Sequence, residues 1–326
     1  MFRSLACLTV CFFAGIAQAS PEQVAAAVER FAEQIKKNPA PAESGPNVLG
    51  LYLADLSTGE VYRIGASADP KLPYCGSPSW LADGTRIYYD ATPSPKSWSE
   101  TRIQSLELSG GKVVRTDLGL GNCPTPSPKG KEYAYLLNPN AVAGVDHNVY
   151  VITTTGEITR KFDTFGAPRW SPNGKQLMVT AFATPTNIQI VDLDNGEKLQ
   201  VELPDHRIYS VPSWAGSDTL VAFVRSAKGF SVALLDTSKP TGLVVKETLW
   251  KRGDGTNVEP MYPVYSQALK RGVFSGREAR GQALYVFEPG KKPTRLEKKE
   301  RFDPKIASLA LSPDGKYLLF CGDRKE

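Results

Sequence analysis

Short runs of β-branched, aromatic and aliphatic residues alternate with turn-forming residues along nearly the whole chain. The runs at residues 51–56 and 188–193 each precede a glycine and are typical of the first strand of a hairpin. A tight hairpin turn needs a positive φ, which a Cβ resists, so glycine is expected there. The expected turn glycines are Gly59, Gly111, Gly156, Gly196, Gly242 and Gly290. The pattern predicts an all-β fold that contains these hairpins.

A second unit recurs between the hairpins. It starts with a proline, continues with an aromatic residue two positions later and ends in a turn of the type S-P-x-G, as in residues 168–174. Six copies follow one another at steps of 44 to 49 residues, which is the length of a four-stranded propeller blade. The equivalent positions are Leu81, Ser127, Ser171, Ala215, Pro263 and Ser312. The repeat therefore predicts a six-bladed β-propeller.

The order of the two units predicts how the ring closes. The propeller repeat begins with an outer hairpin at residues 51–64 and ends with an inner hairpin at residues 306–321, and neither hairpin is a complete blade. We expect the N-terminal outer strands and the C-terminal inner strands to form the sixth blade, because closure hides both sheet edges. A solenoid is the competing architecture, but it would need polar caps at both ends.

Residues 167–177 and 311–318 resemble the repeat of the TolB-like, WD40-like (PD40-type) periplasmic β-propellers. The resemblance covers residues 48–323 and implies the fold and a place in the cell envelope. It implies no particular activity, since propellers with this repeat include partner-binding proteins, peptidase side domains and lyases. TolB itself has a substantial α/β domain before its propeller, and this chain has room there only for a short helix.

The N-terminus predicts export. Residues 1–19 have an early cation, Arg3, an apolar run at residues 5–16 and a small-x-small triplet ending at Ala19, as in a cleaved secretory signal peptide. A membrane anchor is the alternative, but it needs about 20 apolar residues. We therefore expect a periplasmic protein whose propeller spans residues 48–326.

Residues 20–47 predict a short helix and a linker before the propeller. Ser20 and Gln23 form a capping box around Pro21, and Lys36 and Lys37 suit the negative end of the helix dipole. One apolar stripe runs along the predicted helix. It consists of Val24, Val28, Phe31 and Ile35. We expect the stripe to pack on the propeller itself, while docking on a partner is the alternative.

Charge and missing motifs narrow the function. Lys plus Arg number 39 against 34 Asp plus Glu, and a net charge of +5 is too small at this length to imply nucleic acid as a partner. The sequence has no G-x-S-x-G elbow, P-loop, H-E-x-x-H or dinucleotide fingerprint, so we assign no catalytic residue, cofactor or metal. We expect a monomeric module that binds an envelope protein or peptide. One alternative is an exported lyase or hydrolase acting on a polysaccharide or peptide in the channel. The other is a small-molecule binder or a structural component of an envelope complex.

Candidate binding residues fall in the loops that enter the inner strands and in those that join second and third strands, because both sets lie at one end of a propeller. Trp98 is either a ligand contact or a lid on the rim. Arg169 either binds an anion or pairs with an acid of a neighbouring blade. His147 and His206 each follow an aspartate and could act as general bases. The simpler interpretation is that both histidines lie in surface loops without a catalytic role. The full set is Trp98, His147, Arg169, Asp205, His206 and Glu259.

Three cysteines remain once the signal peptide is removed: Cys75, Cys123 and Cys321. Cys75 and Cys123 precede inner strands of neighbouring blades, and a disulfide between them is the arrangement we favour in an oxidising compartment. Two unpaired thiols, or a bridge from Cys75 to Cys321, are the alternatives.

Overall fold

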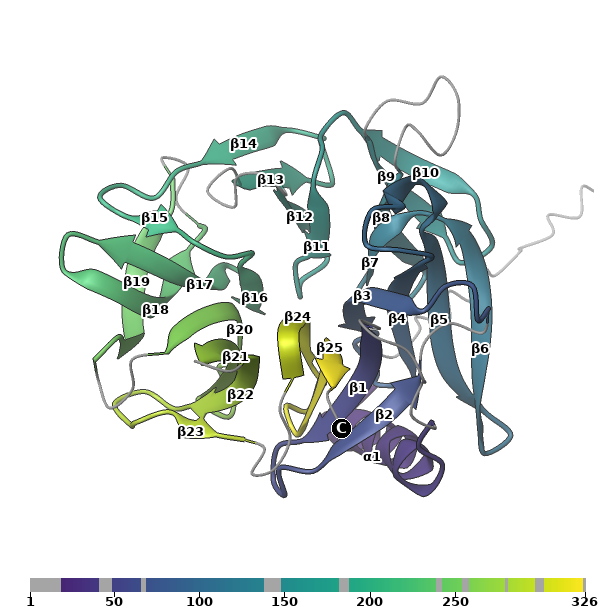
Figure 1. The fold of residues 1–326 in the computed structure, drawn as a ribbon. Helices are drawn as coiled ribbons and strands as arrows, with labels where there is room; N and C mark the ends of the chain where they lie inside the picture. The colour runs from purple at the N-terminus through teal and green to yellow at the C-terminus, as the bar shows by residue number, and fades with distance from the viewer. Residues whose placement is uncertain are drawn as a thin grey trace, which may run out of the picture.

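The computed structural model describes residues 19–40, 49–65, 69–137, 148–181, 188–238, 242–253, 258–278, 281–296 and 302–324. Its strands form blades arranged around a common centre, with a helix packed on the outside (Figure 1). The predicted six-bladed β-propeller with an N-terminal helix is confirmed. Residues 1–18, which hold most of the expected signal peptide, lie outside the described residues. Among the described residues, no helix is long and apolar enough to cross a bilayer.

Each blade is an antiparallel sheet whose first strand faces the centre. The first blade is β3 (Tyr74–Trp80), β4 (Arg86–Thr92), β5 (Arg102–Ser109) and β6 (Lys112–Leu120). The second is β7 (Asn122–Pro126), β8 (Glu132–Leu137), β9 (Asn148–Thr153) and β10 (Ile158–Phe162). The third is β11 (Ala167–Trp170), β12 (Gln176–Thr180), β13 (Ile188–Asp192) and β14 (Lys198–Val201).

The next two blades vary this plan. In the fourth blade two short inner strands, β15 (Arg207–Ile208) and β16 (Ser213–Gly216), both pair with β17. Its other strands are β17 (Thr219–Ser226), β18 (Gly229–Asp236) and β19 (Val244–Lys251). The fifth blade is β20 (Glu259–Ser266), β21 (Arg271–Glu278), β22 (Gly281–Phe287) and β23 (Thr294–Arg295).

The closing blade joins the two ends of the chain. It contains β24 (Phe302–Leu311), β25 (Tyr317–Arg324), β1 (Gly50–Asp55) and β2 (Val61–Gly65). Strand β1 pairs antiparallel with β25 in an uninterrupted register that places Leu53 opposite Leu319. The predicted closure by exchange of chain ends is therefore confirmed, and it pairs the edges that an open ring would expose.

The N-terminal helix α1 (Pro21–Lys37) forms as expected, with both hydrogen bonds of the Ser20–Gln23 capping box in place. Its apolar face is buried on the propeller rather than left for a partner: Val28, Phe31 and Ile35 are almost fully covered. Phe31 lies edge-on against Trp80 of β3, with ring centres 5.7 Å apart. The helix therefore bridges the closing blade and the first blade, which adjoin at this point (Figure 1).

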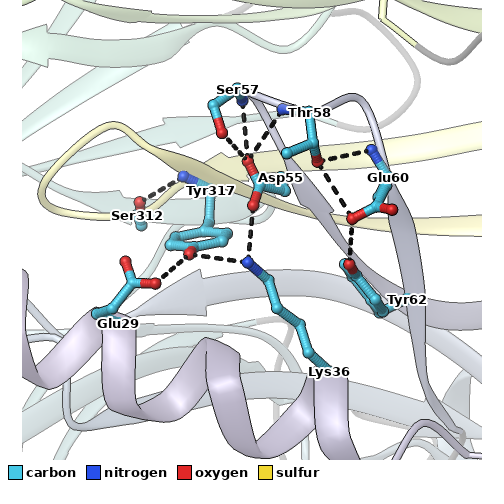
Figure 2. A network of polar contacts seen from close by, with 9 residues as sticks. All are labelled: Glu29, Lys36, Asp55, Ser57, Thr58, Glu60, Tyr62, Ser312 and Tyr317. Atoms are coloured by element: carbon cyan, nitrogen blue, oxygen red, sulfur yellow. Dashed lines mark hydrogen bonds and ion pairs between the residues drawn. The ribbon is translucent and has the colours of Figure 1, made fainter.

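A polar network fixes α1 to both chain ends (Figure 2). Lys36 Nζ lies 2.7 Å from Asp55 Oδ2 at the end of β1 and donates to the Tyr317 hydroxyl of β25 at 3.2 Å. The Tyr317 hydroxyl donates in turn to Glu29 at 2.9 Å. Burial alone would raise the pKa of Asp55, but hydrogen bonds from Lys36 and Ser57 outweigh it and hold that pKa below its ordinary value. The helix thus secures the pairing of β1 with β25.

Candidate functional site: the channel mouth

Six equivalent residues, one from the inner edge of each blade, surround the mouth of the central channel. Each stands directly before the first proline of its unit, or before Leu309 in the last copy. In the fifth copy this proline is Pro263 and not Pro260, because the register shift after Met261 places Tyr262 where Ser77 and Cys123 stand. The expected equivalence of Pro263 with Ser171 is therefore wrong, and Ser266 takes that place. All six line one cavity of about 440 Å³. They are Ser77, Cys123, Ala167, Val211, Tyr262 and Ser308.

Backbone strain is concentrated in this ring. Ser77, Cys123, Tyr262 and Ser308 have φ values of 46°, 54°, 51° and 54°, in the left-handed region that non-glycine residues avoid. The strand register shifts at the same four places, as expected for β-bulges. Such a residue costs about 1–3 kcal/mol and tends to occur at functional sites. The strain therefore marks the channel mouth as the candidate site.

A buried carboxylate links the first two blades at this ring. Asp90 Oδ2 accepts the Cys123 backbone N–H at 2.7 Å, and the Ser77 hydroxyl is hydrogen-bonded to the same carboxylate. Burial raises the pKa of Asp90, and these hydrogen bonds together with the Arg169 charge offset part of that rise. Gly76 packs directly against Asp90 Oδ1, where a side chain would collide with the carboxylate.

Arg169 projects from β11 into the channel. Its Nη1 donates to the Pro168 carbonyl at 2.8 Å, while its own carbonyl accepts the Trp214 indole N–H at 2.9 Å. Among the described residues, no carboxylate lies within ion-pair distance of its guanidinium. Arg169 also lines a second cavity of about 390 Å³ at the opposite end of the channel. The guanidinium is therefore available to a ligand from within the channel.

Trp98 supplies an aromatic wall. It begins the short 3-10 helix η1 (Trp98–Glu100) between β4 and β5, lines the 440 Å³ cavity and keeps 49% of its surface exposed. Its carbonyl accepts the Asn122 amide at 3.3 Å, which ties the loop to the second blade. Met261, Tyr262 and Leu309 continue the apolar lining. The cavity thus combines apolar walls with two arginines, Arg169 and Arg277, the usual composition of a ligand site.

Two of the remaining candidates lie away from this cavity. Asp205 and His206 line a separate hollow on the fourth blade. Glu259 begins β20, where its backbone pairs with Arg277. His147 lies outside the described residues. Within the described part of the chain, no three His, Cys, Asp or Glu side chains are grouped so as to hold a metal ion.

The expected disulfide between Cys75 and Cys123 is wrong, because neither cysteine forms a disulfide in the structure; both are buried, as is Cys321. The two positions are not equivalent: Ser77, and not Cys75, stands directly before the proline as Cys123 does. The Ser77 hydroxyl accordingly lies 3.3 Å from Cys123 Sγ. Cys75 packs instead in the core shared with Cys321.

Sequence reasoning missed Asp90, Ser77 and Tyr262. Asp90 had a usable signal, since it is the charged residue within the otherwise apolar strand at residues 87–91. Ser77 could have been found by asking which residue of each repeat precedes the proline, whereas Tyr262 also required the register of the fifth copy that the structure shows. The left-handed backbone of these residues could not be predicted, because neither is a glycine, the residue type that usually adopts it.

Comparison with known proteins agrees with the fold. Putative TolB from Agrobacterium tumefaciens aligns with a TM-score of 0.59 and 15% identity over 86% of this chain and 100% of that protein. Hydrazine synthase from Kuenenia stuttgartiensis aligns with a TM-score of 0.51 and 17% identity over 79% of this chain and 76% of that protein. TolB from Acinetobacter baumannii aligns with a TM-score of 0.47 and 17% identity over 92% of this chain and 69% of that protein. No family model and no curated protein matches the sequence.

The chain is thus a six-bladed propeller closed by its two ends. It is a distant structural relative of TolB propeller domains, and at this identity the likeness extends to the fold alone.

Proposed function

We propose that this protein is an exported interaction module of the cell envelope, which binds a peptide segment of another envelope protein at the channel mouth. The observation that carries the proposal is the cavity of about 440 Å³ that both Arg169 and the half-exposed Trp98 line. The predicted signal peptide and the structural similarity to TolB support a periplasmic location.

The size of the cavity favours part of a chain as the ligand. At about 440 Å³ it lies in the range of small-molecule sites and is far too small for a folded domain. A protein partner would therefore insert an extended segment, with one chain end or a few side chains inside the channel.

The lining favours a segment that carries a carboxylate beside an apolar residue. The planar guanidinium of Arg169 can bind a carboxylate through two parallel hydrogen bonds. Trp98 offers an apolar face of the kind that dominates binding energy at protein interfaces.

The geometry of Asp90 supports binding over catalysis. Among the described residues that line the cavity, Asp90 has the one titratable carboxyl group. Its Oδ2 is occupied by the Cys123 N–H and its Oδ1 is packed against Gly76. This carboxylate therefore joins the first two blades, which is a structural role.

Selection from a random peptide library tests the proposal. Peptides would be selected on the wild-type protein, and their affinities measured by calorimetry against W98A, R169Q and the control L269A. Leu269 is also 49% exposed but lies at the turn end of the propeller, beside Gly315. We expect W98A and R169Q each to weaken binding about tenfold and L269A to leave it unchanged. Enriched peptides that bind W98A and R169Q as tightly as wild type would refute the site.

A further inference from the structure

Three exposed arginines lie side by side on the fourth blade, outside the channel-mouth cavity. Arg207 of β15 is directly opposite Arg225 of β17, and Arg225 is opposite Phe230 of β18. Arg252, just after β19, donates its backbone N–H to the Phe230 carbonyl at 2.9 Å. The strand register therefore brings three cations, from β15, β17 and the residue after β19, to one end of the blade.

Aromatic rings hold these cations. The Arg207 guanidinium lies 5.6 Å from the centre of the Tyr209 ring, and those of Arg225 and Arg252 lie 5.2 Å and 5.7 Å from the centre of the Phe230 ring. The two rings pack edge to face at 5.3 Å. Arg225 Nη1 also donates to the Tyr209 hydroxyl at 3.2 Å. We refer to these five residues as the arginine–aromatic cluster.

The cluster has more positive charge than the described residues around it neutralise. Like charges directly opposite on paired strands destabilise a sheet. Within the described part of the chain, none of the three arginines has a carboxylate at ion-pair distance. Arg207, Tyr209 and Arg225 line an open hollow of about 570 Å³. Asp205 and His206 also line this hollow, and Asp205 is the acidic residue among the described ones. An anionic ligand would supply a counter-charge that the described residues do not.

We propose that the arginine–aromatic cluster is a second binding site, which takes phosphate groups. Guanidinium forks match phosphate oxygens in pairs, and three of them suit a ligand with more than one negative charge. The hollow is open rather than enclosed, so the phosphate is a group carried by a larger molecule or surface. A lipid headgroup and a soluble phosphate compound share this chemistry.

The test measures two ligands with two matched variants. Sedimentation with vesicles of phosphatidylcholine plus phosphatidic acid, against phosphatidylcholine alone, reports the lipid source, and calorimetry with pyrophosphate reports the soluble one. The arginine variant is R207Q/R225Q/R252Q. The control K129Q/K131Q/K175Q removes the same charge from exposed turns at the other end of the propeller.

We expect wild type and the lysine control to bind at least one ligand equally, and the arginine variant to bind at least about tenfold more weakly. Thermal unfolding checks that the arginine variant is folded, and R225Q alone repeats the test with a single change. Absence of binding in both arms, or equal loss in the lysine control, would overturn the proposal. The arginine variant should bind the peptides selected at the channel mouth as wild type does, so the two sites can fail independently.

Discussion

Replacing Lys36 with methionine tests how α1 contributes to ring closure. The variant K36M keeps the length of the side chain but removes the charge that neutralises Asp55, whose side chain is only 7% exposed. It also removes a donor to the Tyr317 hydroxyl of β25. Asp55 then loses its partner at the end of β1, where the chain turns into β2 of the same blade (Figure 2).

The expected cost lies between two known limits. Exposed ion pairs contribute about 0–1 kcal/mol, whereas breaking a fully buried pair costs about 3–5 kcal/mol. Because the Lys36 side chain is 27% exposed and that of Asp55 is 7% exposed, we expect about 2 kcal/mol. The adjacent Lys37 is the matched control: its pair with Glu33 is 3.6 Å long with both side chains more than half exposed. K37M should change stability by less than about 0.5 kcal/mol.

Urea unfolding of wild type, K36M, D55N and K36M/D55N measures the coupling directly. Asparagine suits position 55 because it can still accept the Ser57 backbone N–H, which bonds Asp55 at 2.9 Å. We expect a coupling energy of about 1–2 kcal/mol between positions 36 and 55. A coupling below about 0.3 kcal/mol would refute the role assigned to this ion pair.

The same pair predicts a pH dependence. The folded-state pKa of Asp55 is below its ordinary value of 3.8, so its contribution is complete above that pH and is lost as pH falls through the folded-state pKa. Wild type should therefore lose its stability advantage over D55N as the pH falls below 3.8. An advantage that persists unchanged into that acidic range would contradict the assignment.

Two further predictions concern the channel mouth. Burial raises the pKa of Cys123 to about 12, so its thiol stays protonated and unreactive at neutral pH. In protein that starts at Ser20, a thiol reagent should find almost no reactive thiol in the native state and three after denaturation. One thiol in the denatured protein would indicate a disulfide after all. G76A places a methyl group against the Asp90 carboxylate and should cost about 1–3 kcal/mol in urea unfolding; a variant as stable as wild type would show that the ring adjusts.

Much of the fold could be predicted because it repeats. The proline–aromatic–turn unit and the hairpin glycines are local signals, and their order along the chain was enough to predict closure by both ends. The helix could be predicted as well, because its cap and its apolar stripe are local features of residues 20–37. Each of these features depends on spacing within one repeat.

The site was harder because it depends on contacts between repeats. Arg169 and Trp98 were found as single residues, but their shared cavity exists only after six blades converge. The disulfide error came from matching Cys75 to Cys123 by their position before a strand, when the proline register pairs Cys123 with Ser77. The arginine–aromatic cluster was missed because Arg207, Arg225 and Arg252 meet only through strand register.

Site-specific photo-cross-linking tests most directly whether ligands bind at the channel mouth. A benzophenone amino acid replaces Trp98 in one protein and Leu269 in another, two positions that are equally exposed at opposite ends of the propeller. A peptide selected on the wild-type protein is added and irradiated, and cross-linked product is measured by mass spectrometry. The account predicts cross-linking from position 98 and none from position 269. Equal yields from both positions, or product from position 269 alone, would contradict it.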